Sequence, residues 1–100
     1  MGQLWAVVGD PNSHGGGELT LSGDSSPGTV FINNIPVIVG TTDAGPDGLA
    51  DPDGPPHDDP KSSSHSATVF AYNKPAHRNG DTRVCGATTV VVNETTVFVG

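Results

Sequence analysis

The feature that most constrains the fold of this chain is internal repetition. The tripeptide Thr-Val-Phe occurs three times in 100 residues, at 29–31, 68–70 and 96–98. A second motif, Gly-Asp-x-x-x-His/Cys-Gly, occurs at residues 9–15 and again at 80–86. Repetition of this kind indicates a repeated supersecondary unit. We therefore expect a fold built from similar pieces rather than from one continuous sheet.

Glycine and proline set the class of that fold. The chain has 14 Gly and 9 Pro, which argues against long helices because both residues weaken a helix interior. We predict one all-β domain over residues 1–100, with strands at 4–8, 18–21, 29–32, 35–39, 68–72, 75–78, 87–92 and 95–99. Turns at Asn33-Asn34, Asn73-Lys74 and Asn93-Glu94 would join the last six strands into three hairpins, since Asn tolerates positive φ.

The domain is small and weakly apolar, so it needs support beyond its core. Hydrophobic residues make up 33% of the chain, and the single cysteine excludes an internal disulfide. A metal ion or a docking partner would supply the missing stability. The formal charge of −7, with only four Lys and Arg, excludes nucleic acid as that partner.

Nothing in the sequence indicates export or membrane insertion. No apolar stretch approaches the ~20 residues that cross a bilayer, and the N-terminus lacks the basic start and apolar stretch of a secretory signal. We therefore expect synthesis in the cytoplasm without a signal peptide.

Residues 41–64 differ in kind from the rest of the chain. They hold six Asp, five Pro and three Gly, and a loop of this length is usually functional or pinned. His57 is the residue that could pin it. The carboxylates lack the ligand spacing and terminal Glu of a calcium-binding helix-loop-helix, so we interpret them as a solvated acidic loop: Asp43, Asp47, Asp51, Asp53, Asp58 and Asp59.

Four histidines and the one cysteine offer a candidate metal site. His14 and Cys85 occupy the same position of the Gly-Asp motif, and a turn at Gly80-Asp81 separates His77 from Cys85. Zinc commonly takes imidazoles and thiolates at the corners of a tetrahedron. The competing interpretation of Cys85 is a small buried hydrophobe.

The remaining histidine ligand of this metal site is either His57 or His65. His57 stands eleven residues before Thr68, which is also the spacing between Cys85 and Thr96, and this match favours His57. We predict one zinc ion per chain on four ligands: His14, His57, His77 and Cys85.

Asp10 and Asp81 follow Gly in the two copies of the motif. They either orient a ligating histidine or fix a turn through their own side chains, and the turn is the simpler interpretation. A catalytic Cys85 with His77 as its base would need a third, orienting group, and the sequence shows none. We therefore do not expect an enzyme.

Taken together, these segments resemble the PAAR-repeat family. The resemblance covers nearly the whole chain and rests on residues 9–16, 29–33, 55–57, 68–81 and 85–87. Its most specific part is His-Arg-x-Gly-Asp-x-x-x-Cys-Gly at residues 77–86. The tetrapeptide that names the family, Pro-Ala-Ala-Arg, reads Pro-Ala-His-Arg at residues 75–78. Residues 35–41 depart from the pattern, because they lack the Arg and Asp of their later counterpart.

Members of that family are small cones of β-hairpins that cap the spike of contractile injection machines. The resemblance therefore implies a pseudo-threefold cone with zinc, or iron in its place, near the apex, held by His14, His57, His77 and Cys85. It also implies a blunt base that binds a trimeric β-helical spike, one tip per trimer. The expected base contacts are the repeated tripeptides: Thr29, Val30, Phe31, Thr68, Val69, Phe70, Thr96, Val97 and Phe98.

The same resemblance implies where such a tip would act. The site of action would be a phage tail baseplate or the end of a type VI secretion spike, and the tip would meet the target membrane during piercing. The acidic loop 41–64 should lie away from the base, since carboxylates resist the desolvation that burial requires.

A free-standing, zinc-stabilised β module is the alternative. Such a binding or adaptor domain would need a concave apolar pocket for a small ligand. With one Trp, one Tyr and three Phe, the chain has little to line one, so no small-molecule substrate is expected.

Overall fold

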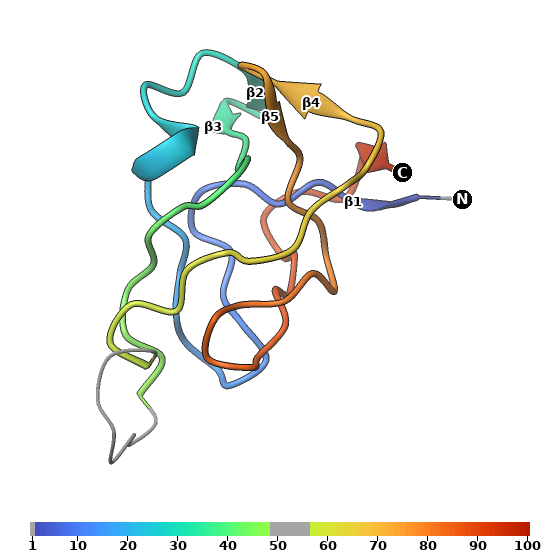
Figure 1. The fold of residues 1–100 in the computed structure, drawn as a ribbon. Helices are drawn as coiled ribbons and strands as arrows, with labels where there is room; N and C mark the ends of the chain where they lie inside the picture. Colours follow the sequence, from blue (N-terminus) through green and yellow to red (C-terminus); the bar gives the residue numbers. More distant parts are fainter. Residues whose placement is uncertain (1, 49–56) are drawn as a thin grey trace.

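The computed structural model describes residues 2–48 and 57–100, which form three short pairs of antiparallel strands (Figure 1). The pairs are β1 (Gln3–Leu4) with β6 (Phe98–Val99), β2 (Phe31–Ile32) with β3 (Ile35–Pro36), and β4 (Phe70–Ala71) with β5 (Lys74–Pro75). A short 3-10 helix, η1, lies at Gly23–Ser25. The all-β prediction is confirmed, although the paired strands are shorter than expected. Residues 49–56 of the acidic loop, with Asp51, Asp53 and Pro55-Pro56, lie outside the described residues.

Two of the strand pairs are tight hairpins with the same turn. Asn33 and Asn34 join β2 to β3 with φ values of 53° and 66°, and Tyr72 and Asn73 join β4 to β5 with 54° and 63°. Positive φ at both central residues is the requirement of a two-residue hairpin loop whose twist matches that of the strands. The first turn was predicted correctly. The second lies one residue before the predicted Asn73-Lys74.

The third strand pair corrects the prediction of a last hairpin around Asn93-Glu94. Strand β6 pairs with the N-terminal β1, with Gln3 opposite Val99, and not with residues 87–92. The expected turn residues have other partners: Asn93 donates to the Asp10 carboxylate, and Glu94 accepts two backbone N–H groups. The chain therefore runs on past Asn93 and closes against its own beginning.

Each Thr-Val-Phe segment is fixed by one oxygen that accepts the N–H groups of both Thr and Val. The acceptors are Ser66 Oγ for Thr68 and Val69, Glu94 Oε1 for Thr96 and Val97, and Tyr72 Oη for Thr29 and Val30. Ser66 and Glu94 stand two residues before their Thr. Pro27 stands at that position in the first segment and has no acceptor in its side chain, so the neighbouring hairpin supplies Tyr72 instead.

A ring of three backbone hydrogen bonds joins the segments that follow the strand pairs. Ala6 N–H donates to the carbonyl of His77 at 2.9 Å, His77 N–H to Ile38 at 3.0 Å, and Ile38 N–H to Ala6 at 2.9 Å. All three residues are fully buried. Because each donates to the next and accepts from the previous one, this central ring (Ala6, Ile38, His77) gives the backbone a pseudo-threefold axis.

The apolar core consists of two clusters of buried residues. One cluster of buried residues lies with the strand pairs: Trp5, Val7, Ile32, Val37, Val39, Ala76 and Val99. A smaller one comprises Ala6, Leu19, Ile38, Ala44 and Val91. Both are small, as the composition predicted, and many polar side chains are buried beside them.

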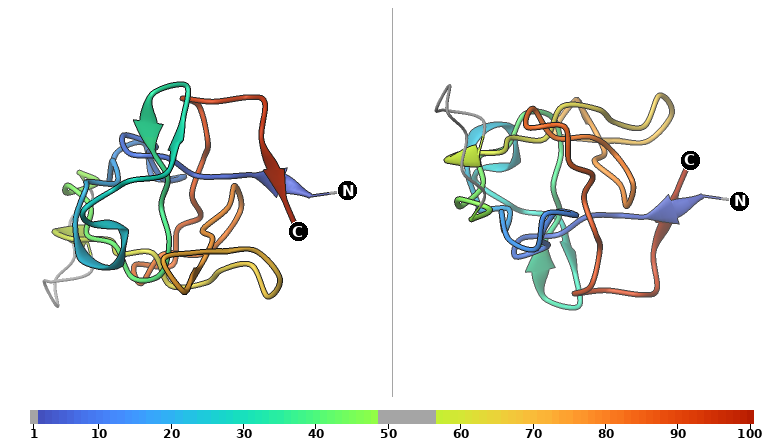
Figure 2. Two further views of the ribbon diagram at one scale, coloured as in Figure 1. Left: turned by 90° about the horizontal axis from the view of Figure 1, so that it is seen from above. Right: turned by 90° about the horizontal axis from the view of Figure 1, so that it is seen from below.

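The strand pairs and the loops gather at different ends of the molecule. Strands β2 to β5 lie at the top of Figure 1, and both termini lie near β1 and β6. The blue, yellow-green and orange loops lie towards the opposite end of Figure 1. Figure 2, seen from above and from below, shows both termini on the side away from the yellow-green segment. Within the described ranges, no helix has the length and apolar character needed to cross a membrane.

Candidate metal centre

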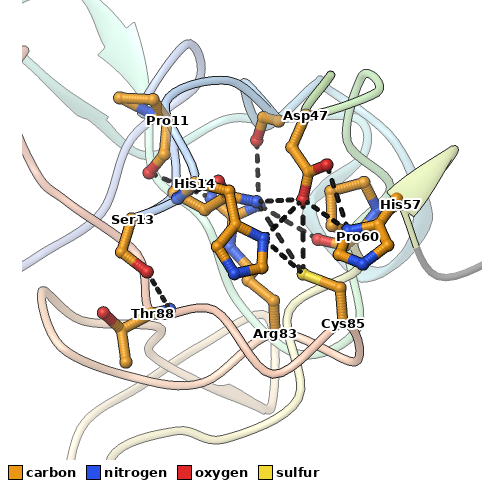
Figure 3. A network of polar contacts seen from close by, with 11 residues as sticks. Pro11, Ser13, His14, Asp47, His57, Pro60, Arg83, Cys85 and Thr88 are labelled. Atoms are coloured by element: carbon orange, nitrogen blue, oxygen red, sulfur yellow. Dashed lines mark hydrogen bonds and ion pairs between the residues drawn. The ribbon is translucent and has the colours of Figure 1, made fainter. Parts of the chain in front are cut away.

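Four side chains converge where the loops meet: His14, Asp47, His57 and Cys85 (Figure 3). Each offers one ligand atom, and these atoms all lie within 4.8 Å of one another. Three members of this metal group were predicted from the sequence, and Asp47 was not. The group could hold a metal ion.

Residues 12–16 and 83–87 form the same five-residue turn, which explains why the Gly-Asp motif occurs twice. In both turns the N–H of the first residue donates to the carbonyl of the fifth, and the N–H of the fourth residue donates to the carbonyl of the first. The fourth residue is Gly15 or Gly86, with φ of 95° or 90°, a region in which a side chain is strained. The third residue is His14 or Cys85, so both turns present their ligand at the same corner.

The long loop supplies the other two ligands. The N–H of Asp47 donates to the carbonyl of His57 at 3.1 Å, which holds the two residues together. Gly16 lets the first turn approach them, because a Cβ there would stand 2.9 Å from the Asp47 Cα. The structure thus brings His57 into the group. His65 instead binds the carbonyl of Gly40 through Nε2.

The Asp47 carboxylate lies at the centre of the group. Its Oδ2 is 3.1 Å from Nδ1 of His14, 3.1 Å from Nδ1 of His57 and 3.5 Å from Sγ of Cys85. Asn12 Nδ2 donates to the same oxygen at 3.2 Å. Donors around a tetrahedral ion lie roughly 3–4 Å apart when the bonds are about 2.0–2.3 Å. The distances from the Asp47 oxygen fall in this range. Two imidazoles, a carboxylate and a thiolate also suit a transition metal chemically.

The surroundings of Cys85 favour its protonated thiol. Burial raises the pKa of the thiol, and the negative Asp47, which accepts a hydrogen bond from Sγ, raises it further. A metal would bind the thiolate, so its binding would release this proton. The same carboxylate that holds the thiol in place can then become a ligand.

His77 is the predicted ligand that the structure places elsewhere. It belongs to the central ring, at the position of Ala6 and Ile38 in the other two segments. Its Nδ1 lies 2.8 Å from the carbonyl of Ser64 and its Nε2 lies 2.6 Å from Oγ1 of Thr89. Both ring nitrogens are engaged, and the fourth member of the metal group is Asp47.

Asp10 and Asp81 act as turn residues. Each carboxylate accepts the backbone N–H three residues earlier, that of Val7 or Arg78, at 2.8 Å. Burial raises the pKa of Asp10 against the effect of these backbone bonds. For Asp81, burial is outweighed by the hydrogen bonds from Arg78, which hold its pKa below the usual value. The simpler of the two sequence interpretations describes their contacts.

Replacing His77 by Leu should alter the pH dependence of stability and spare the metal. Burial lowers the pKa of His77 to about 4; Ser64 and Asp81 oppose the shift, and Arg83 and His65 reinforce it. The His77 imidazole is harder to protonate in the folded state than in the unfolded chain. Its contribution to the free energy of unfolding is therefore fully present above pH ~6.5 and falls by about 3 kcal/mol as the pH drops to ~4. The loss of stability in His77→Leu should therefore be largest at pH 7 and shrink towards pH 4.

Urea unfolding of both proteins at several pH values measures this effect. Their difference at each pH cancels the contributions that both proteins share, such as those of the carboxylates. A difference that does not change with pH, or a folded His77→Leu protein that has lost its metal, would contradict the placement of this side chain.

Asp47 was missed because it was counted with the solvated acidic residues of the loop. The repeat contained a signal for it. His14 stands eight residues after Ala6 in the first segment, and Cys85 eight after His77 in the third. The corresponding position after Ile38 is residue 46, next to Asp47.

Comparisons with known proteins add nothing to this geometry. No protein-family model matches the chain, and neither does any curated protein. Function therefore has to be inferred from the fold, the metal group and the exposed surface.

Proposed function

We propose that this chain is the tip of a trimeric β-helical spike in a contractile injection machine. The observation that carries the proposal is the placement of the three phenylalanines. Phe31, Phe70 and Phe98 lie in three similar strand pairs, and they are exposed to 54%, 56% and 57%. These are all the Phe residues of the chain. Large apolar side chains left this exposed on a small domain normally mark an interface.

The symmetry of the backbone suits such a partner. A trimer offers three identical edges around its axis, and a single chain can meet all three alike only if it repeats itself threefold. The central ring supports this, because it relates the three strand pairs to one axis. One chain per trimer is therefore the expected stoichiometry.

The proposed base consists mainly of the phenylalanine face (Phe31, Phe70, Phe98) and the Thr residues beside it. Of the nine residues predicted to contact the partner, Thr29, Thr68, Thr96 and Val30 are also exposed, whereas Val69 and Val97 pack partly against the core. The two valines would then support the contact strands from behind rather than meet the spike directly.

We further propose zinc as the ion of the metal group and a position for it near the narrow end of the tip. The four ligands come from residues 14, 47, 57 and 85, so one ion would tie together loops that are distant in sequence. In Figure 1 these loops lie away from strands β2 to β5. A structural metal there would stiffen the end that meets a target membrane, and the role would be mechanical rather than catalytic.

Mixing this protein with a trimeric β-helical spike protein, sought among the genes beside its own, tests the proposal. Light scattering after size exclusion should show one chain per spike trimer. An unrelated trimeric β-helical protein, mixed in the same way, serves as the control and should remain separate. Three chains per trimer, or no complex at all, would contradict the proposed role.

A further inference from the structure

Arg83 is a buried cation whose side chain binds almost entirely to backbone carbonyls. Its side chain is only 2% exposed. Nη1 donates to the carbonyls of Gly17 at 2.8 Å and Pro60 at 3.0 Å. Nη2 donates to those of Asp10 at 3.3 Å and Pro11 at 3.2 Å, and Nε to Oγ1 of Thr89 at 2.6 Å.

The carbonyls that Arg83 binds flank the ligands of the metal group. Pro11 and Gly17 lie on either side of His14, and Pro60 follows His57 by three residues. Arg83 itself stands two residues before Cys85. Figure 3 shows the Arg83 side chain behind His14, between Pro11 and Pro60. A single side chain thus joins the segments that carry three of the four ligands.

The fourth ligand is connected to the same contacts through Gly17. The carbonyl of Gly17 accepts a hydrogen bond from Arg83. The N–H of Gly17 donates to the carbonyl of Pro46 at 3.2 Å, and Pro46 directly precedes Asp47, the fourth ligand. The position equivalent to Arg83 in the first turn is Asn12, which also serves the group. Its amide donates to Asp47 and accepts the backbone N–H of His14.

Only an arginine can make this set of contacts. The guanidinium is a rigid planar fork that directs several N–H groups at once, whereas the ammonium of lysine is a compact point charge. Burying a cation is costly, so its hydrogen bonds must be well satisfied. A chain that needed only to fill this space could do so with an apolar side chain.

We propose that Arg83 is the positioning residue of the metal centre. Its guanidinium holds the segments of His14, His57 and Cys85 at the spacing that the ion requires before the ion arrives. This inference rests on the metal centre proposed above. Loss of Arg83 should therefore weaken metal binding even though the residue is not itself a ligand.

Metal titration of Arg83 variants tests this role. Arg83→Met keeps the length and removes every donor, while Arg83→Lys keeps the charge and removes the fork. Removing a side chain that orients metal ligands typically costs about 10- to 100-fold in affinity. We expect a loss of that size for zinc in Arg83→Met, a smaller one in Arg83→Lys, and a changed Co²⁺ absorption spectrum in both.

Arg78→Met is the matched control. Arg78 also holds several contacts, to the Asp81 carboxylate and the carbonyls of His65 and Gly100, none of which belongs to the metal group. Its loss should lower the melting temperature while leaving zinc affinity and the Co²⁺ spectrum at the wild-type values.

Each outcome decides between the alternatives. A folded Arg83→Met protein with wild-type affinity would overturn the inference, as would an equal loss of affinity in Arg78→Met. If Arg83→Met does not fold, Arg83→Lys decides, and wild-type affinity and spectrum in that variant would overturn it. If the wild-type protein binds neither zinc nor cobalt, the metal centre itself is wrong and the role of Arg83 falls with it.

Discussion

Replacing Cys85 by Ser should abolish stoichiometric metal binding and lower the melting temperature by roughly 15–30 °C. A ligand present at a thousand times its dissociation constant stabilises a protein by about 4 kcal/mol. In a domain of this size each kcal/mol shifts the melting temperature by about 4–8 °C. A serine hydroxyl cannot replace a thiolate, so this contribution should disappear. Elemental analysis and calorimetry of the purified proteins measure the two effects.

The histidines provide matched variants for the same experiment. His57→Ala removes a member of the metal group, and His65→Ala removes an imidazole that binds the carbonyl of Gly40. The first should lose the metal and the second should keep it. Asp47→Asn keeps the shape of the side chain but removes its charge, and it should weaken binding. Metal loss in His65→Ala with retention in His57→Ala would show that the ligands are wrongly assigned.

Replacing Phe31, Phe70 and Phe98 together by Ser should abolish binding to the spike trimer and leave the fold intact. More than half of each side chain is exposed, so the fold gains little from them. Aromatic residues at the centre of an interface each contribute about 2 kcal/mol or more, so the triple variant should bind at least roughly 10⁴-fold more weakly. Size exclusion of the mixed proteins and circular dichroism of the variant measure the two effects.

Single variants make this prediction sharper. Under a pseudo-threefold contact, Phe31→Ser, Phe70→Ser and Phe98→Ser should weaken binding to a similar degree. Val84→Ser is the control, because Val84 is 51% exposed and lies beside Cys85 rather than in a strand pair. A complex that depends on one phenylalanine alone, or one that survives the triple change, would exclude this face as the base.

The parts of the fold that local chemistry determines could be predicted from the sequence. Asn33 and Asn34 indicated a tight turn because few other residues accept positive φ twice in succession. The pairing of β1 with β6 could not be predicted in this way. It joins the two ends of the chain and depends on no turn, and Asn93-Glu94 offered a convincing local alternative that the side chains of Asp10 and Glu94 override.

The members of the metal group that lie in the repeated motif could be predicted from the sequence. His14 and Cys85 occupy one position of a repeated motif, so the sequence could pair them. His77 misled the prediction because nearness to Cys85 along the chain says nothing about direction, and its backbone position turns it into the core. Asp47 was hidden because an aspartate in an acidic loop is ordinarily solvated, and only its burial distinguishes it.

The pairing of β1 with β6 has a consequence for how the protein is made. Ala6 lies in the central ring, yet the strand beside it is paired only when residues 98–99 arrive. At synthesis rates of about 5–20 residues per second, the first segment must wait several seconds for its partner. Contacts this distant in sequence also slow folding itself. The pairing of β1 with β6 therefore cannot form until residues 98–99 have been made, so this strand pair should close later than the ring, whose three residues are all present once residue 77 has been made.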